Sequence, residues 1–125
     1  MPVQEVPNVI VNVFNPDELL ERLMGDRQLA GIILKGFLDD APSQLNNLRE
    51  QLDQADGPGI RLQAHTLKGA AATVAAGSLH AIALAMEQTG ADGQLDNCRA
   101  LLPRAVEEFE RFKETLERTA WVQVK

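Results

Sequence analysis

A short segment at residues 65–71, HTLKGAA, combines residue types that are unusual together in a helix. His65 supplies an imidazole, which is nucleophilic in its neutral form near neutral pH. Lys68 follows one helical turn later, and its ammonium would stabilise an anion attached to the ring. Gly69 comes next, although glycine inside a helix costs about 1 kcal/mol relative to alanine. An accessible histidine with a nearby ammonium suits a phosphoryl acceptor.

The apolar periodicity around this segment predicts that His65 points toward solvent. With an advance of about 100° per residue, a helix over residues 58–75 has one inward stripe, formed by Ile60, Ala64, Leu67, Ala71 and Val74. His65 lies roughly 135° away from that stripe on the same count. The residues expected on the same side of the helix are Arg61, Lys68, Gly69, Ala72 and Ala76. Most of them are small, which leaves the ring accessible to a large partner.

His80 is the second of the two histidines and lacks this setting. The residues three and four positions after it are Ala83 and Leu84, so neither a cation nor a glycine accompanies it. We interpret His80 as a partly exposed surface histidine. A solvated side chain is also the simplest interpretation of His65 taken alone, and its combination with Lys68 favours the phosphoryl acceptor.

The N-terminal half of the chain predicts three helices. Asn15 suits the N-cap of a short first helix, and Glu18 would complete a capping box. After Gly25, a second helix over about residues 26–39 would bury one face, formed by Leu29, Ile32, Ile33 and Phe37. A third helix is expected to begin at Asp40 and Pro42, and to bury Leu45, Leu48, Leu52 and Ala55.

Two further helices are expected after the one that contains His65. A break at Gly77 and Ser78 precedes a helix that buries Leu79, Ile82, Ala83 and Met86. The last helix shows the longest apolar pattern, formed by Leu95, Cys98, Leu102, Ala105, Phe109, Phe112 and Leu116. Pro103 falls within this pattern and predicts a kink or a local break. Together the elements predict an all-α fold, an antiparallel four-helix bundle with additional short N-terminal helices.

A length of 125 residues, 45% of them apolar, predicts a single domain with its own core. We place an N-terminal leader at residues 1–13, the bundle at residues 14–119 and a C-terminal tail at residues 120–125. Residues 9–14 are strand-like in composition, but one short strand cannot form a sheet. We therefore expect the leader to lie against the domain.

Charge and cysteine content exclude several classes of protein. A net charge of −6 argues against a general nucleic-acid binder, because no basic stripe is available to neutralise phosphates. The single cysteine, Cys98, permits no intrachain disulfide and fits a reducing, cytoplasmic setting. No uncharged apolar run approaches the roughly 18 residues of a membrane span, and no signal peptide is evident. We expect a monomer without membrane contact.

Residues 64–88, AHTLKGAAATVAAGSLHAIALAMEQ, resemble the histidine-containing phosphotransfer (HPt) domain family. The family signature is approximately His-x-Leu-Lys-Gly, followed by small residues, a glycine and spaced aliphatic residues that end in Glu. The segment from His65 to Gly69 matches directly, and Glu87 falls at the end of the aliphatic pattern. The similarity covers roughly residues 15–118. The family usually has Gly where this chain has Ala75, and often Ser at Ala70, so the turn near Ala75 is expected to differ locally.

The resemblance implies an intermediate in a multistep phosphorelay. A receiver domain with an aspartyl phosphate would dock over His65, whose Nε2 would accept the phosphoryl group and pass it to another receiver. Lys68 would orient or neutralise that group, and Gly69 would permit close approach. The docking surface is expected to include Arg61, Ala72 and Ala76. The implied partners are receiver domains of response regulators or of a hybrid sensor histidine kinase.

Such domains lack kinase or phosphatase activity of their own and use no cofactor. The magnesium ion belongs to the receiver, so no metal site is expected in this chain.

Two alternatives belong to other functional classes. A helical docking or adaptor domain would keep the fold and bind receivers without being phosphorylated. A small-molecule enzyme would use His65 as a general base, which normally requires an orienting carboxylate and a pocket. The predicted helix offers no acid within one turn of His65. Solvent exposure of His65 distinguishes this alternative from the phosphotransfer module.

Overall fold

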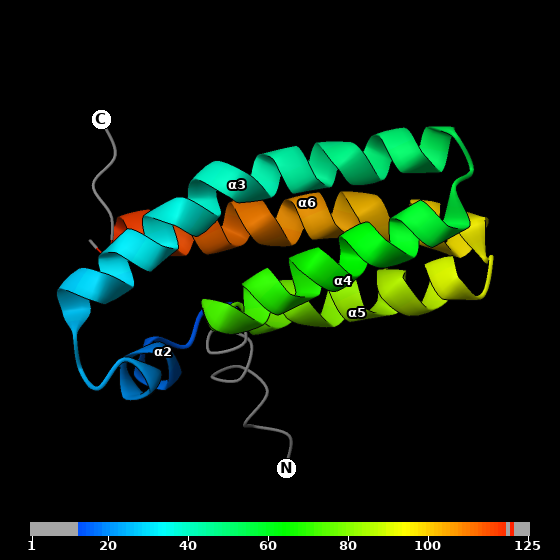
Figure 1. The fold of residues 1–125 in the computed structure, drawn as a ribbon. Coiled ribbons are helices and arrows are strands. Elements are labelled where there is room, and N and C mark those ends of the chain that lie inside the picture. Colours follow the sequence, from blue (N-terminus) through cyan, green and yellow to red (C-terminus); the bar gives the residue numbers. More distant parts are fainter. Residues whose placement is uncertain (1–12, 120, 122–125) are drawn as a thin grey trace, which may run out of the picture.

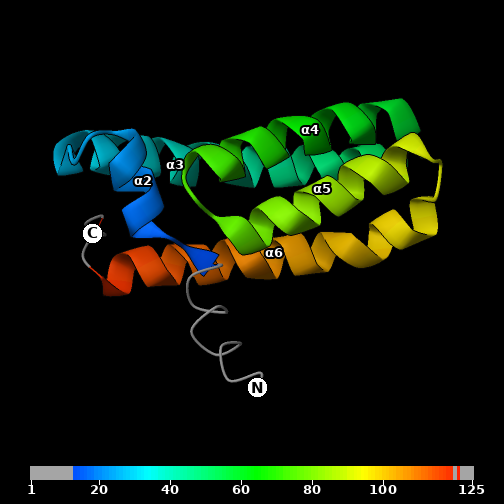
Figure 2. The ribbon, with the colours of Figure 1, turned by 90° about the horizontal axis from the view of Figure 1, so that it is seen from below.

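The computed structural model describes residues 13–119 and residue 121, and their secondary structure is helical (Figure 1). The helices lie in the order α2 (Pro16–Arg22), α3 (Arg27–Asp53), α4 (Gly57–Thr73), α5 (Gly77–Ala91) and α6 (Leu95–Arg118). Helices α3 to α6 lie side by side in a bundle, and α2 crosses one end of it (Figures 1 and 2). The predicted all-α bundle is therefore confirmed.

Helix α3 is one long helix where two were expected. Pro42 lies inside it and does not begin a new helix. The reason is a single buried stripe that continues past the proline, formed by Ala30, Leu34, Phe37, Ala41, Leu45, Leu48 and Leu52. Pro42 itself is exposed, so burial of this stripe outweighs the helix penalty of proline. The predicted inward face was also wrong in part, because Leu29, Ile32 and Ala55 are exposed.

Helix α6 likewise continues through its proline. A break was expected at Pro103, and the helix instead runs uninterrupted from Leu95 to Arg118. The predicted inward residues are buried with the exception of Leu95, which is half-buried. Packing of this stripe against α3 and α5 again decides the local structure.

Helix α4 lies between α3 and α5 and is held by the predicted stripe. All five residues of that stripe are buried, from Ile60 to Val74. Asp56 caps the N-terminus of the helix, accepting a hydrogen bond from the Gly59 N–H at 3.0 Å. The inward residues predicted for α5 are buried as well. The buried stripes of α4 and α5 are therefore placed as the sequence predicted.

The turn between α4 and α5 explains the family's glycine. Ala75 has φ +59°, a left-handed conformation that favours glycine. The Ala75 N–H bonds to the Ala72 carbonyl at 3.1 Å, and the Ala76 N–H bonds to the Ala71 carbonyl at 2.9 Å. This is the hydrogen-bond pattern that commonly ends a helix at a left-handed residue. Replacing Gly with Ala thus keeps the turn geometry at a cost in backbone strain.

Aromatic contacts join the N-terminal segment to the bundle. Phe14 packs edge-on against Phe112 of α6 with ring centroids 5.4 Å apart, and Trp121 packs edge-on against Phe14 at 5.8 Å. Arg27 stacks over the Trp121 ring at 4.1 Å. Trp121, placed in the expected tail, therefore contacts the domain. Of the expected leader at residues 1–13, the structure describes only Val13, which is buried. Residues 9–12 of the strand-like segment also lie outside the described residues.

Candidate functional site

His65 lies in the middle of α4 and points outward. Leu67 and Ala64 beside it are buried, whereas the His65 side chain is 60% exposed. The predicted orientation of the imidazole is thus observed. The ring is therefore open to solvent.

The sequence interpretation gave no site role to Glu87, the carboxylate that contacts His65. Glu87 lies on α5, and its Oε2 is 2.9 Å from Nδ1 of His65. Its other oxygen, Oε1, is 2.8 Å from Nζ of Lys68. The relevant signal was the glutamate that ends the aliphatic pattern of α5. A glycine one turn later helps this approach, because a Cβ at Gly90 would lie 2.9 Å from a side-chain carbon of Ile60.

The contact with Glu87 fixes the tautomer of a neutral His65. The hydrogen bond with Lys68 lowers the pKa of Glu87, with a further contribution from His65, although partial burial acts in the opposite direction. Glu87 is therefore ionised at neutral pH and can only accept hydrogen bonds. Nδ1 of His65 must carry the proton, which leaves Nε2 unprotonated with a free lone pair. The same arrangement would stabilise positive charge on the ring.

Lys68 is held beside this pair by the same carboxylate. Its side chain is 24% exposed, so its ammonium is partly shielded from water, which strengthens its interaction with nearby charge. The prediction placed Lys68 near His65, and the structure adds that both contact Glu87. When His65 is neutral, the single negative charge of Glu87 balances the single positive charge of Lys68.

The remaining predicted surface residues divide into two groups. Arg61, Gly69 and Ala72 are exposed on α4, and no atom lies within 4 Å of a Cβ built at Gly69. Ala76 is 0% exposed, so its prediction as a docking residue was wrong. The helix ends at Thr73, and Ala76 then turns inward at the start of α5. Counting helical periodicity beyond the end of the helix caused this error.

His80 occupies a different setting from His65. It is partly exposed at the start of α5, as predicted, and lines a shallow hollow with Glu18 and Asn15. No ion pair joins His80 to another residue within the described part of the chain. His80 therefore lacks a carboxylate that would fix its tautomer.

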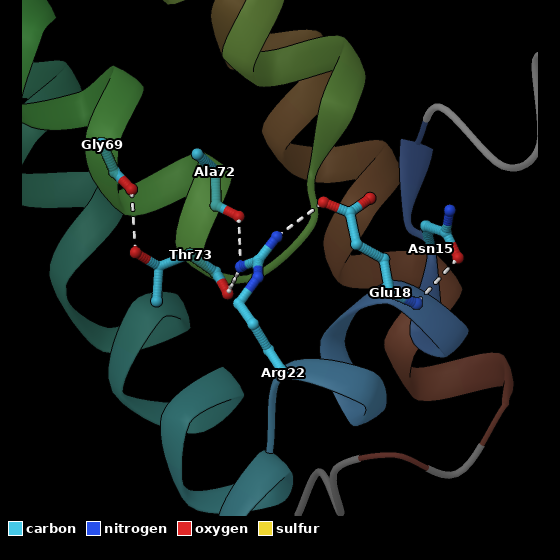
Figure 3. Close-up of polar contacts among 6 residues, drawn as sticks. All are labelled: Asn15, Glu18, Arg22, Gly69, Ala72 and Thr73. Carbon is cyan, nitrogen blue, oxygen red and sulfur yellow. Dashed lines mark hydrogen bonds and ion pairs between the residues drawn. The ribbon is translucent and has the colours of Figure 1, made fainter. Parts of the chain in front are cut away.

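Helix α2 is attached to the C-terminal end of α4 by Arg22. Figure 3 shows the guanidinium between Glu18 and the last turn of α4, where Nη1 donates to the Ala72 and Thr73 carbonyls, at 2.9 Å each. Glu18 pairs with Arg22 and does not complete the predicted capping box. The Asn15 side chain caps α2 as predicted, and its backbone N–H donates to the Ala75 carbonyl at 3.0 Å. These bonds satisfy carbonyls that the helix end leaves open.

Comparison with known proteins identifies the family. The family model described as the Hpt domain matches residues 33–120, and the chain belongs to this family. Hpt domains are phosphotransfer carriers that take part in phosphorelays and interact with receiver domains. Neither the curated proteins nor the solved structures contain a significant match to the chain. Helix α2 and the first turns of α3 precede the matched residues.

The described residues contain neither a membrane-spanning helix nor a cluster of metal ligands. None of their helices combines the length and apolar character that crossing a membrane requires. Within residues 13–119 and 121, no three side chains of the His, Cys, Asp and Glu types cluster as metal ligands would.

Proposed function

We propose that His65 is the phosphoacceptor of this Hpt domain. The observation that supports this most strongly is the exposed imidazole with Nδ1 bound to Glu87, since it leaves Nε2 as the free nucleophile facing solvent. His80 lacks an equivalent carboxylate. The donor and the acceptor are receiver domains, of response regulators or of a hybrid sensor histidine kinase.

Transfer to His65 needs no proton movement on the ring. The Nε2 lone pair attacks the phosphorus of the aspartyl phosphate, the N–P bond forms, and the bond from phosphorus to the aspartyl oxygen breaks. The aspartate leaves as a carboxylate, and the ring becomes positively charged with its Nδ1 proton in place. Glu87 stabilises that charge through the existing hydrogen bond. Transfer to a second receiver reverses these steps.

Lys68 compensates the charge that the phosphoryl group brings. A phosphoryl group adds about −1.5 to −2 charges at neutral pH. The charge of Glu87 is already divided between His65 and Lys68, so the ammonium can turn toward the phosphoryl oxygens once the ring itself is positive. Lys68 thus acts as a phosphoryl-stabilising residue and, in the free protein, as a partner that holds Glu87 in place.

Gly69 and Ala72 give a receiver room above the nucleophile. Both are exposed on the same helix, and space around Gly69 is open. A side chain at position 69 would stand one turn above His65 and separate it from the incoming phosphoryl group. Arg61 lies one turn before His65 and contributes a cation at the edge of this surface.

The structure bears on the enzyme alternative in two ways. Glu87 does supply an orienting carboxylate, contrary to what α4 alone suggested. A general base, however, works best in a site that excludes water, and His65 is 60% exposed. We therefore propose a phosphoryl carrier without kinase or phosphatase activity, whose partner supplies the magnesium ion.

The proposal is tested by incubating the protein with receiver domains that carry labelled phosphate. The expected label on this protein is stable to base and labile to acid, and it is absent in His65→Gln. His80→Gln is the matched control and should accept label at the wild-type rate. Label that persists in His65→Gln would show that another residue accepts the group. Receiver binding without any transfer would support the adaptor alternative.

A further inference from the structure

A shallow apolar groove separates α3 from the C-terminal half of α4. Its α3 side includes Ile33, Gly36 and Phe37, and its α4 side includes Ala70 and Thr73. Gly36 is exposed, and no atom lies within 4 Å of a Cβ built on it. The absence of a side chain at this position keeps the groove open.

The groove is continuous with the surface around His65. Ala70 and Thr73 directly follow Gly69 and Ala72, which face the proposed receiver. A helix rises 1.5 Å and turns about 100° per residue, so exposed Thr73 lies about 12 Å along α4 from His65 and about 80° around the helix from it. A domain that covers His65 and Gly69 therefore reaches the groove without leaving the surface of α4.

Two exposed aliphatic residues extend this surface along α3. Leu29 and Ile32 are 40% and 64% exposed, and their spacing places them on the same side of α3 as Ile33 and Gly36. Exposed apolar surface that continues a groove is typical of a protein interface. Both residues precede position 33, where the match to the family begins. The family match therefore does not cover this part of the surface.

One charged residue, Asp40, lines the groove. Asp40 forms no ion pair with any other described residue. An apolar groove with one unpaired carboxylate fits a partner surface that presents aliphatic side chains beside a lysine or an arginine.

We propose that the receiver domain docks asymmetrically, over the groove between α3 and α4, and that Leu29 and Ile32 contribute to the choice among receivers. This inference rests on the proposed function, because the occupant of the groove is the receiver that exchanges phosphate with His65. Aliphatic side chains of the receiver enter the groove beside Gly36, and a basic side chain pairs with Asp40. The flank formed by α5, where Leu84 is the exposed aliphatic residue, contributes less.

Two pairs of variants test the position of the receiver. Gly36→Leu fills the groove and raises helix propensity, so the fold should tolerate it. Its control is Ala100→Leu, which adds the same side chain at an exposed position of α6. Ile32→Gln removes apolar surface from the proposed interface, and Leu84→Gln removes it from the α5 flank. Circular dichroism and thermal unfolding establish that each variant is folded.

The receiver domain is first chosen by its ability, when phosphorylated, to transfer phosphate to the wild-type protein. Titration calorimetry then measures the Kd between each variant and the unphosphorylated form of that receiver. Gly36→Leu and Ile32→Gln should each raise Kd about tenfold or more, as expected for central interface positions. Both control variants should stay within about twofold of wild type, because rim and distant substitutions have small effects. Asp40→Asn should raise Kd at low salt and less so at high salt.

The outcomes separate this inference from the proposed function. Unchanged Kd values in Gly36→Leu and Ile32→Gln, with normal transfer to the wild-type protein, overturn the docking inference alone. A larger effect of Leu84→Gln than of Ile32→Gln also overturns it, because it places the receiver on the α5 flank. If no receiver transfers phosphate to the wild-type protein, the proposed function and this inference are both rejected.

Discussion

The contact between His65 and Glu87 is the central feature at the scale of single residues. Helical periodicity was sufficient to predict that His65 and Lys68 face outward, because both lie on one helix whose buried stripe is clear. Glu87 comes from another helix, 22 positions later. Its contact depends on how α5 packs against α4, which no pattern within one helix contains. The sequence therefore predicted the outward-facing imidazole and missed the carboxylate that contacts it.

Replacing Glu87 should slow phosphorylation of His65. In Glu87→Gln the amide can donate to Nδ1, which favours the tautomer with a proton on Nε2, and the negative charge is lost. We expect the rate of phosphoryl acceptance to fall about tenfold, corresponding to about 1.4 kcal/mol in the barrier. Single-turnover transfer from a phosphorylated receiver measures this rate. A wild-type rate in folded Glu87→Gln would remove Glu87 from the proposed mechanism.

The lowered pKa of Glu87 predicts a pH dependence of stability. The folded protein binds this proton less readily than the unfolded chain does, so the ionised carboxylate stabilises the fold above the ordinary glutamate pKa of about 4.3. That contribution is lost as the pH falls through the lowered pKa of the folded state. Urea unfolding of the wild type and Glu87→Gln should therefore show a larger difference at pH 7 than in acid. An equal difference at both pH values contradicts the pKa shift.

At the scale of helices, prolines and helix ends show what local rules can predict. Pro42 and Pro103 were read as a helix start and a break, and both lie inside continuous helices. Proline preferences act on one or two residues, whereas the buried stripe of α3 spans the entire helix. The N-cap at Asn15 was predicted correctly because a cap depends on its immediate neighbours. The bond from Arg22 to α4 spans 50 residues, and local rules do not reach it.

Left-handed alanines at helix ends predict a stabilising substitution. Ala55 ends α3 with φ +54° and is exposed, so its methyl group contributes little packing. Ala55→Gly should raise the free energy of unfolding by about 0.5–1 kcal/mol, because relief of left-handed strain exceeds the entropy cost of glycine. Chemical denaturation measures this change. Ala75→Gly should gain less, since Ala75 is buried, and a loss of stability in Ala55→Gly would contradict the assignment of strain.

At the scale of the whole molecule, the core joins segments from both ends of the chain. The ring of Phe112 is fully buried and packs edge-on against Phe14 and against Phe37, at 5.4 Å in each case. The apolar pattern predicted that Phe112 and Phe37 would point inward. It did not predict that Phe14 would meet them, because the partner of a short N-terminal segment depends on the assembled bundle.

Removal of the Phe112 ring should destabilise the whole domain. Phe112→Ala is expected to cost about 3–5 kcal/mol, from lost burial and from the cavity left behind. A domain of this size has a total stability of about 5–15 kcal/mol, so the melting temperature should fall steeply. Thermal unfolding monitored by circular dichroism measures the change, with Phe112→Leu as a milder control. A loss below about 1 kcal/mol would show that this aromatic cluster does not hold the N-terminal segment to the bundle.

The central claim is that Nε2 of His65 accepts the phosphoryl group while Nδ1 remains bound to Glu87. Heteronuclear NMR of the ¹⁵N-labelled protein, phosphorylated by a receiver domain, tests it most directly. The account predicts one phosphohistidine, with phosphorus bonded to Nε2 of His65 and a proton on Nδ1, and unmodified His80. Phosphorus on Nδ1 of His65, on His80, or on no histidine would contradict it.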